Sequence, residues 1–439
     1  MKRIACRPIL HGYTVKRRPA ASAVQSSHMR AASSKPAVSE PAFLSDALRL
    51  AKEWDVRQHS NAVAAIAEAP YPPSATETVS LAAVDDALKS MEQWPDFGCT
   101  PLLSLPWLAQ SCGVKAVFAK DESGRCGLTS FKALGGGLVV DDAVKKALAE
   151  GKSASEVTVV SASAGNHGMG VAWGAKRTGC QAVIYLGERV SESIAQKMRD
   201  LGARVCRVPG LYEDSLSAAK QDAARNGWTL VQDVSWEGYN SIPARIHAGY
   251  AVVASEILQQ FAQMPDGPPT HVLVNAGVGG FACAVCGYLW QKLGAARPRF
   301  ICVEPTAADC VQHASRTGNL VQPTGSDSTM QTGLDCREVS PLAWHVLDTG
   351  VNDYMAVPDV AVGPCMKLLA QNLQPIVAGE SGVAGIAVLL AAATRPDLKE
   401  VLRLDSDSRV AVIVCEAPPS ADLYKALVGL APDEVAISK

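Results

Sequence analysis

One lysine of this sequence lies in a setting that favours amine chemistry. Lys132 stands between Phe131 and Ala133 in the segment TSFKALGGG, residues 129–137. We expect these neighbours to bury the lysine, and burial lowers a lysine pKa toward the free amine that Schiff-base chemistry requires. Alone this signal is weak, because most lysines in such settings are solvated.

A glycine-rich segment, SAGNHGMG at residues 163–170, follows a predicted strand and opens a predicted helix. Backbone N–H groups at a helix N-terminus bind anions without a charged side chain, and glycines allow a ligand to come close. The segment is therefore a candidate seat for a carboxylate or a phosphate. A tightly packed strand-to-helix turn is the alternative, and His167 by itself is interpreted as a helix-start or packing residue.

A second glycine segment, GVGGF at residues 277–281, directly follows the predicted strand at 271–275. Successive N–H groups with a helix behind them form an anion-binding nest, so we predict a phosphate cradle here. The dinucleotide fingerprint does not match, because it requires glycine where Ala282 stands. An amine, a phosphate cradle and a carboxylate seat are together the three attachments that a pyridoxal 5'-phosphate enzyme needs.

The elements that must position these motifs are short β-branched runs separated by segments of helix length. The predicted strands are 157–163, 181–186, 204–208, 229–233, 271–275, 300–303 and 410–415. We predict further helices over residues 42–53 and 81–92. Strands that alternate with helices are typical of βαβ units and of a parallel sheet covered on both faces.

The pattern predicts an α/β fold with mostly parallel, twisted sheets in two three-layer domains. Residues 140–235 contain four strand-helix alternations and are predicted to form a small α/β domain. Residues 41–139 and 236–439 would then form a large domain that binds the cofactor. Ligand sites in such folds lie beyond the carboxyl ends of strands, where the three motifs stand.

Charge divides the 439-residue chain into two unlike parts. Residues 1–39 contain eight Lys and Arg and no acid, while the remaining residues carry 33 basic and 43 acidic side chains. A body with that acidic excess has no general attraction for nucleic acid, which is not expected as a partner. The basic segment, predicted as a disordered leader over 1–40, has the composition of an organellar transit peptide or of a basic tail.

Neither a membrane span nor a metal site is predicted. The uncharged run Val272–Trp290 has the length of a span, but Asn275 and its glycines divide it into a strand, a turn and a helix. The thirteen cysteines are scattered, and the one close pair, Cys283 and Cys286, lacks a second pair or a His cluster to complete a zinc site. We interpret both as ordinary buried thiols.

The order of the motifs resembles that of fold type II pyridoxal phosphate enzymes, the tryptophan synthase β-like family. Within it, several segments look like the diaminopropionate ammonia-lyases. These segments are SFKALGG, GNHGMGVAWGAK, VQDVSWEGYNSIPARIHAGY, HVLVNAGVGG, MQTGLDCREVSPLAWHVL and GESGVAG. The resemblance implies a homodimeric lyase that converts 2,3-diaminopropionate, as the L-isomer, to pyruvate and ammonia.

The resemblance also implies a role for each matched position. Lys132 would form the Schiff base with the cofactor, and Asp233 would take the α-proton of the L-isomer. The other implied cofactor contacts are Asn166 to the ring oxygen, Cys415 to the ring nitrogen, and Gly277, Val278, Gly279 and Gly280 to the phosphate. The substrate carboxylate would be bound by Ser163, Ala164, Gly165 and His167.

One departure from the family pattern affects the substrate. Diaminopropionate ammonia-lyases carry Thr-Asp-Gly-Asn-His where this chain has Ser163, Ala164, Gly165, Asn166 and His167. The carboxylate that serves the D-isomer is therefore absent, and the string is nearer to that of serine and threonine dehydratases. A second departure is Cys-Glu-Ala-Pro at 415–418, where the family has Thr-Glu-Gly-Asp. A dehydratase-like β-eliminase and a non-catalytic cofactor-binding homologue remain as alternatives.

Overall fold

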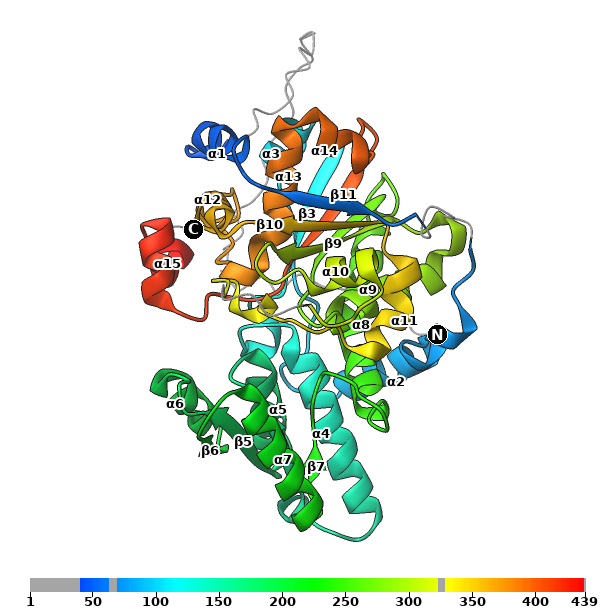
Figure 1. The fold of residues 1–439 in the computed structure, drawn as a ribbon, viewed down its shortest axis with the longest axis vertical. Helices are drawn as coiled ribbons and strands as arrows, with labels where there is room; N and C mark the ends of the chain where they lie inside the picture. Colours follow the sequence, from blue (N-terminus) through cyan, green and yellow to red (C-terminus); the bar gives the residue numbers. More distant parts are fainter. Residues whose placement is uncertain (1–39, 63–68, 323–327, 438–439) are drawn as a thin grey trace, which may run out of the picture.

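The computed structural model describes residues 40–62, 69–322 and 328–437, so the predicted leader lies outside the described residues except for Glu40. Two sheets organise this part of the chain, a larger one in the upper half of Figure 1 and a smaller one in the lower half. Helices cover both sheets. The predicted α/β fold class is confirmed.

The larger sheet has seven strands. In spatial order they are β1 (Arg57–Ser60), β10 (Asp353–Val357), β9 (Arg299–Pro305), β8 (His271–Asn275), β11 (Arg409–Val414), β3 (Ala116–Asp121) and β2 (Leu102–Ser104). The five inner strands run parallel, while β1 and β2 pair antiparallel at the two edges.

The smaller sheet has four strands, all parallel. In spatial order they are β6 (Arg204–Val208), β5 (Gln181–Gly187), β4 (Thr158–Ala162) and β7 (Thr229–Leu230). Its helices are α5 (Asn166–Thr178), α6 (Glu192–Asp200) and α7 (Tyr212–Asn226). We propose that this sheet and its helices mark the small domain at 140–235. The boundary at residue 140 falls inside α4 (Lys132–Ala149), which passes from one half to the other.

The remaining helices belong to the larger half. They are α1 (Leu44–Ala51), α2 (Leu81–Met91), α3 (Pro106–Cys112), α8 (Ser241–Phe261), α9 (Gly280–Leu293), α10 (Cys310–Thr317), α11 (Pro341–Gly350), α12 (Val362–Ala370), α13 (Ala384–Thr394), α14 (Pro396–Val401), α15 (Ala421–Val428) and α16 (Pro432–Ile437). Among the residues described, no helix combines the length and the apolar character needed to cross a membrane. Residues 272–290 form the end of β8, a turn and most of α9, as predicted.

The larger sheet has an apolar core on each face. Val272 and Val274 of β8 pack into one cluster, while Leu273 between them packs into the other. Successive side chains of a strand point to opposite faces, so burial of both faces requires the continuous apolar run that the sequence contains. The sheet is therefore enclosed, and the ends of its strands are left for ligand binding.

The predicted strands are present, but one prediction was too long and four strands were missed. β7 ends at Leu230 instead of Asp233, since the chain turns away from the sheet there and places Asp233 in a loop. The missed strands are β1, β2, β3 and β10. β3 escaped prediction because it contains the charged residues Lys120 and Asp121, and Lys120 is buried only with the help of α8.

Candidate active site

The predicted Schiff-base lysine and the predicted base form an ion pair. Lys132 begins α4, and its Nζ donates to Oδ2 of Asp233, which follows β7. Both side chains are largely buried, with 23% and 15% of their surface exposed. The rings of Phe131 and Tyr250 lie beside the ammonium, each centroid 5.7 Å from Nζ. The structure thus brings together two residues that stand 101 positions apart.

The pair holds both groups in their charged forms. Burial acts to lower the pKa of Lys132, but the Asp233 carboxylate outweighs it and the pKa stands above its ordinary value. The predicted effect of burial is present, but the expected net shift toward a free amine is wrong for this structure, because the sequence neighbours of Lys132 did not reveal the carboxylate of Asp233. Burial acts to raise the pKa of Asp233, whereas His167 and Lys132 hold it below its ordinary value.

Close packing of α4 on α5 fixes the position of Lys132. A Cβ added at Gly170 of α5 would lie 2.7 Å from the Lys132 carbonyl oxygen, and one at Gly136 of α4 would lie 2.9 Å from the Val171 nitrogen. Only glycine permits helices to approach this closely. These glycines therefore fix the position of α4, and of Lys132 at its start, relative to α5.

The predicted phosphate cradle is a turn between β8 and α9. Gly279 is the residue before the helix and has a φ of +92°, the left-handed region that favours glycine. A Cβ at Gly277 would lie 2.9 Å from Cys336 Sγ, and one at Gly279 would lie 2.7 Å from a Leu347 methyl. The Val278 carbonyl accepts from the Ser340 N–H at 2.9 Å, which anchors the turn from behind. The first turn of α9 therefore presents its N–H groups from a rigid loop.

A histidine that the sequence analysis missed lies against this cradle. His247 of α8 is fully buried, and its Nε2 lies 3.0 Å from the position that a Cβ on Gly280 would take. Its Nδ1 lies 3.6 Å from Cys283 Sγ. Burial lowers the pKa of His247 to about 4, so the ring is neutral at physiological pH. It lies within the family-like segment VQDVSWEGYNSIPARIHAGY, but no role was assigned to it, because only the packing of α8 brings it to the cradle.

Asn166, predicted to contact the ring oxygen of the cofactor, begins α5 and is held from two sides. Its Nδ2 donates to Glu416 Oε2 at 2.7 Å, and its Oδ1 accepts from Thr129 Oγ1 at 3.2 Å. The segments that contain Thr129 and Glu416 are joined by a backbone hydrogen bond, in which the Ala417 N–H donates to the Thr129 carbonyl at 2.8 Å. Glu416 is a site residue that the sequence analysis did not name.

Cys415, the predicted partner of the ring nitrogen, directly follows β11 and is buried. Its Sγ donates to the Ser381 carbonyl at 3.4 Å, and Asn275 Nδ2 lies 3.6 Å from the same sulfur. Burial raises the pKa of Cys415 above its ordinary value, so the thiol keeps its proton. A neutral hydrogen-bonding group thus stands at the end of the strand.

The predicted carboxylate seat lies between β4 and α5, and its residues differ in how far they are exposed to solvent. Ala164 and Gly165 are exposed, and a Cβ at Gly165 would meet no atom within 4 Å. Ser163 is partly buried, and its Oγ accepts from the Gly165 N–H at 3.2 Å. His167 is buried, with Nε2 3.0 Å from the Val231 carbonyl and Nδ1 3.8 Å from Asp233 Oδ2. It therefore faces Asp233 instead of the open side of the seat.

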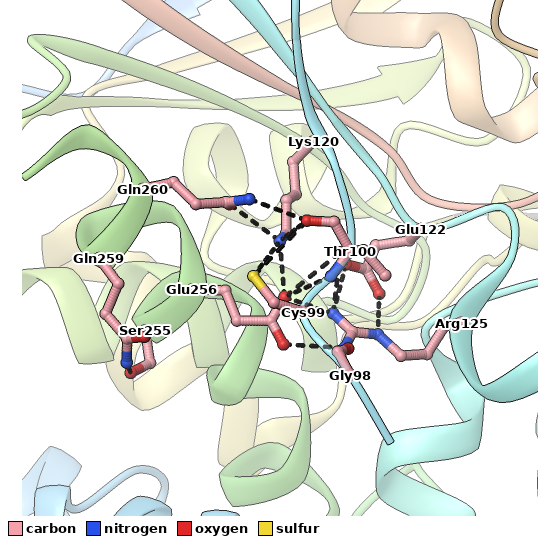
Figure 2. A network of polar contacts seen from close by, with 10 residues as sticks. All are labelled: Gly98, Cys99, Thr100, Lys120, Glu122, Arg125, Ser255, Glu256, Gln259 and Gln260. Atoms are coloured by element: carbon pink, nitrogen blue, oxygen red, sulfur yellow. Dashed lines mark hydrogen bonds and ion pairs between the residues drawn. The ribbon is translucent and has the colours of Figure 1, made fainter. Parts of the chain in front are cut away.

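A buried charge network supports the loop that leads to Lys132, and Figure 2 draws it. The Arg125 guanidinium, buried completely, bonds both Glu122 and Glu256 at 2.7 Å, and Lys120 Nζ bonds Glu256 at 2.6 Å. Arg125 also donates to the Gly98 carbonyl at 2.7 Å. Two cations and two anions thus tie β3, α8 and the following loop together. Their spacing along the chain carried no recognisable motif.

These side chains fit the predicted cofactor by the chemistry of their donors. The site holds the amino group of Lys132, the N–H groups in the first turn of α9, and the protonated thiol of Cys415. Nε2 of His247, which has no partner among the described residues, lies beside the cradle. A phosphate, an aldehyde and a ring nitrogen are the groups that such donors can satisfy.

Comparisons with known proteins give a family and a set of relatives. The family model described as "Pyridoxal-phosphate dependent enzyme" matches residues 94–416. The diaminopropionate ammonia-lyase of Escherichia coli K12 is 35% identical over 351 residues, which cover 75% of this chain and 87% of the relative. A biosynthetic L-threonine dehydratase of Corynebacterium glutamicum is 28% identical over 236 residues, which cover 53% of this chain and 51% of that protein.

A solved structure of a diaminopropionate ammonia-lyase from Escherichia coli is also similar. It contains an aminoacrylate-PLP azomethine reaction intermediate. The two folds superpose with a TM-score of 0.77 at 32% sequence identity, over 86% of this chain and 97% of the solved chain.

Proposed function

The chain belongs to the family of pyridoxal-phosphate-dependent enzymes, and we propose that it is an ammonia-lyase acting on 2,3-diaminopropionate. It is a carbon–nitrogen lyase that uses pyridoxal 5'-phosphate. The substrate and one water would give pyruvate and two molecules of ammonia by α,β-elimination and hydrolysis. The observation that carries the proposal is the Lys132–Asp233 pair, whose backbone lies against both glycine segments. A Cβ at Gly170 would lie 2.7 Å from the Lys132 carbonyl oxygen, and one at Gly280 would lie 3.6 Å from the Asp233 carbonyl oxygen.

We assign the L-isomer because of the groups available to take the α-proton. Asp233 is a carboxylate beside the reactive lysine, whereas position 164, which serves the D-isomer in the resembling family, is alanine. A positioned general base contributes about 10²–10⁴ to a rate. The D-isomer should therefore react about 100-fold or more slowly than the L-isomer.

The residues of the site divide the work of binding and proton transfer. When bound, pyridoxal phosphate supplies the electron sink that makes the α-proton acidic. Lys132 would hold the cofactor through its amine, and the same amine would be able to accept and return a proton. Lys132 and His167 hold the Asp233 pKa low against the effect of burial, so Asp233 becomes a stronger base once Lys132 has lost its charge. The proton that reaches Lys132 or Asp233 then assists departure of the β-amine.

Assays over a small panel of amino acids test this proposal. We expect pyruvate and ammonia from L-2,3-diaminopropionate, with pyruvate from L-serine and 2-oxobutyrate from L-threonine at least about tenfold slower. The Lys132→Ala variant should lose the visible absorption of the bound cofactor together with the activity. Retention of full activity by that variant, or the absence of cofactor absorption in the purified protein, would contradict the proposal.

A serine or threonine dehydratase-like eliminase is the second candidate, and Ala164 favours it. The similarity to the L-threonine dehydratase covers about half of each chain, which supports it less than the ammonia-lyase similarity. A higher rate on L-serine or L-threonine than on either diaminopropionate isomer would select this candidate.

The Ala164→Asp variant separates both enzymes from a non-catalytic homologue. Because residue 164 is exposed at the seat, the new carboxylate should be tolerated. Gain of D-isomer activity with retained L-isomer activity supports the ammonia-lyase. No activity in either form of the protein, with cofactor bound, would favour the non-catalytic homologue.

Two further proposals concern assembly and location. We propose a homodimer, as the resemblance to the family implies, and light scattering of the purified holoenzyme at a monomer mass would contradict it. We also propose that the basic segment 1–40 directs the protein to an organelle. A fusion of residues 1–40 to a fluorescent protein that stays diffuse in the cytosol would count against that role.

A further inference from the structure

We propose that Glu416 is a positioning residue that, together with Thr129, orients the Asn166 amide so that an N–H faces the ring oxygen of the cofactor. The inference rests on the proposed function in two respects: pyridoxal phosphate is bound at this site, and Asn166 contacts its ring oxygen, as the resemblance implies. It concerns the state of the cofactor before any substrate arrives.

The hydrogen-bonding capacity of an amide carries the argument. An asparagine side chain offers one carbonyl oxygen and two N–H donors. The Asn166 carbonyl accepts from Thr129 Oγ1 at 3.2 Å, and one N–H donates to Glu416 Oε2 at 2.7 Å. One N–H is then left for the ligand. In the reverse orientation the carbonyl oxygen would face the Glu416 carboxylate, and the two acceptors would repel each other.

The backbone around Glu416 is built to hold its carboxylate in this place. Its Oε1 accepts from the Ser381 N–H at 3.3 Å. A Cβ at Gly333 would lie 3.2 Å from Oε2, and one at Gly379 would lie 3.1 Å from Cγ, so both neighbours must be small. The residue is buried, with 5% of its surface exposed. Few other rotamers are therefore open to it.

Burial and the charges around Glu416 place its pKa near neutral pH. Burial and the adjacent Glu380 raise the pKa of Glu416 to about 7, against the lowering effects of its bond to Ser381 and of Lys132. Glu380 is itself buried, and neither of its carboxylate oxygens has a hydrogen-bond partner. Burial and the negative charge of Glu380 therefore both favour the protonated form of Glu416.

Protonation of Glu416 would change the group that Asn166 presents to the ring oxygen from an N–H donor to a carbonyl acceptor. As an anion, Glu416 accepts only, and the remaining Asn166 N–H stabilises an ionised ring oxygen. Once protonated, Glu416 can donate to the Asn166 carbonyl, so the amide can turn and present its oxygen to the ring. The ring oxygen must then carry its own proton. The ratio of ionised to protonated ring oxygen should therefore change with pH near neutrality.

The test uses the holoenzyme without substrate, and it follows the cofactor absorption bands of the ionised and protonated ring oxygen across the pH range. In the wild-type protein we expect a transition near neutral pH. Glu416→Gln, which cannot titrate, should abolish the transition and weaken cofactor binding about tenfold, a change of about 1.4 kcal/mol. Glu304→Gln is the matched control, because Glu304 is a buried glutamate that bonds the Val311 and Gln312 N–H groups away from Asn166.

A Glu416→Gln protein with the wild-type transition and cofactor affinity would overturn the proposal. If that variant fails to fold, a substitution at the exposed Thr129 tests the proposal instead. Thr129→Val removes the donor to the Asn166 carbonyl and should reduce the ionised fraction about threefold, and an unchanged fraction would equally overturn it. Neither readout needs turnover. A wild-type protein that shows the transition but forms no pyruvate from diaminopropionate would contradict the proposed function alone.

Discussion

At the scale of single residues, the reactive groups of the site determine each other's charge. Lys132 is held as an ammonium by Asp233, and Asp233 is held as a carboxylate by Lys132 and by His167 behind it. Neither charge would persist at this degree of burial without its partner. The pair is therefore a matched acid and base, and loss of the carboxylate should affect catalysis more than cofactor binding.

Replacement of the carboxylate tests this division. Asp233→Asn keeps the shape of the side chain but removes its basicity, so we expect the rate of elimination from the L-isomer to fall about 100-fold or more. Cofactor absorption should persist, because Lys132 remains. Steady-state kinetics and the absorption spectrum measure the two effects. Asp200→Asn, at an exposed position of α6, is the control, and a wild-type rate in Asp233→Asn would exclude the proposed role.

At the scale of secondary-structure elements, two features carry Lys132 to its place. One is the glycine contact between α4 and α5, and the other is the buried network around Arg125 at the start of the preceding loop. Cys126, the next residue, has a φ of +53°, a left-handed conformation that costs about 1–3 kcal/mol for such a residue. The ion pairs of Arg125 with Glu122 and Glu256 stabilise this turn.

The helix contact can be tested by adding one methyl group. Gly170→Ala places a Cβ 2.7 Å from the Lys132 carbonyl oxygen, so α4 and α5 must separate. We expect a loss of about 1–3 kcal/mol in the free energy of unfolding, as for other overpacked cores. Urea unfolding measures the loss, and kcat should fall with it. Gly124→Ala, where a Cβ meets no atom within 4 Å, should change neither; equal stability of the two variants would refute the packing argument.

The buried network should respond strongly to loss of its central cation. Arg125→Leu leaves Glu122 and Glu256 buried without their partner, and we expect a cost of about 3–5 kcal/mol in the free energy of unfolding. The control is Arg199→Leu, which removes an exposed pair with Glu192 and should cost at most about 1 kcal/mol. Chemical denaturation compares them. Similar costs for the two variants would mean that burial adds nothing to the pair.

Acid should reveal the same network in the wild-type protein. Burial opposes ionisation of Glu256, but Arg125 and Lys120 outweigh it and lower its pKa to about 2, from an ordinary value of 4.5. A carboxylate with a lowered folded-state pKa contributes stability that is present above its unfolded pKa and is lost as the pH falls. Stability should thus decline between about pH 4.5 and 2, and Arg125→Leu should flatten that decline. An unchanged slope would contradict the assignment.

At the scale of the whole molecule, the site lies between the two halves, where Lys132 bonds Asp233 and Asn166 bonds Glu416. The smaller sheet contributes the ends of β4 and β7, which lead to the carboxylate seat and to Asp233. The larger sheet contributes the ends of β8 and β11, which lead to the phosphate cradle and to Cys415. A cofactor held by groups from both halves should therefore stabilise them against separation (Figure 1).

Cofactor binding should accordingly raise the resistance of the whole chain to unfolding. At 100 times its Kd, a ligand that binds only the folded state adds about 2.7 kcal/mol. We expect a higher Tm with pyridoxal phosphate, and a much smaller rise for Lys132→Ala. Pyridoxal without phosphate is the control for the contribution of the cradle. An identical Tm with and without cofactor would place the binding groups outside this site.

The sequence predicted the elements and motifs that depend on local pattern. The strands β4, β5 and β8 were recognisable because each is largely a run of buried apolar residues, and β6 because of its β-branched Val205 and Val208, although none of its residues is buried. The glycine turn before α9 was recognisable because its conformation requires glycine. β3 was missed because it contains the buried Lys120, whose charge is compensated by Glu256, 136 residues away.

By itself, then, the sequence determined the α/β class and the glycine turns, which depend on neighbouring residues, and it made Lys132 the candidate for the reactive lysine. The tertiary structure alone decided how these groups are charged and oriented. Asp233 reaches Lys132 across 101 positions, and Glu416 reaches Asn166 across 250. Such contacts follow from the packing of whole elements around a shared core, and electrostatic interactions act through space at the distances that this packing sets.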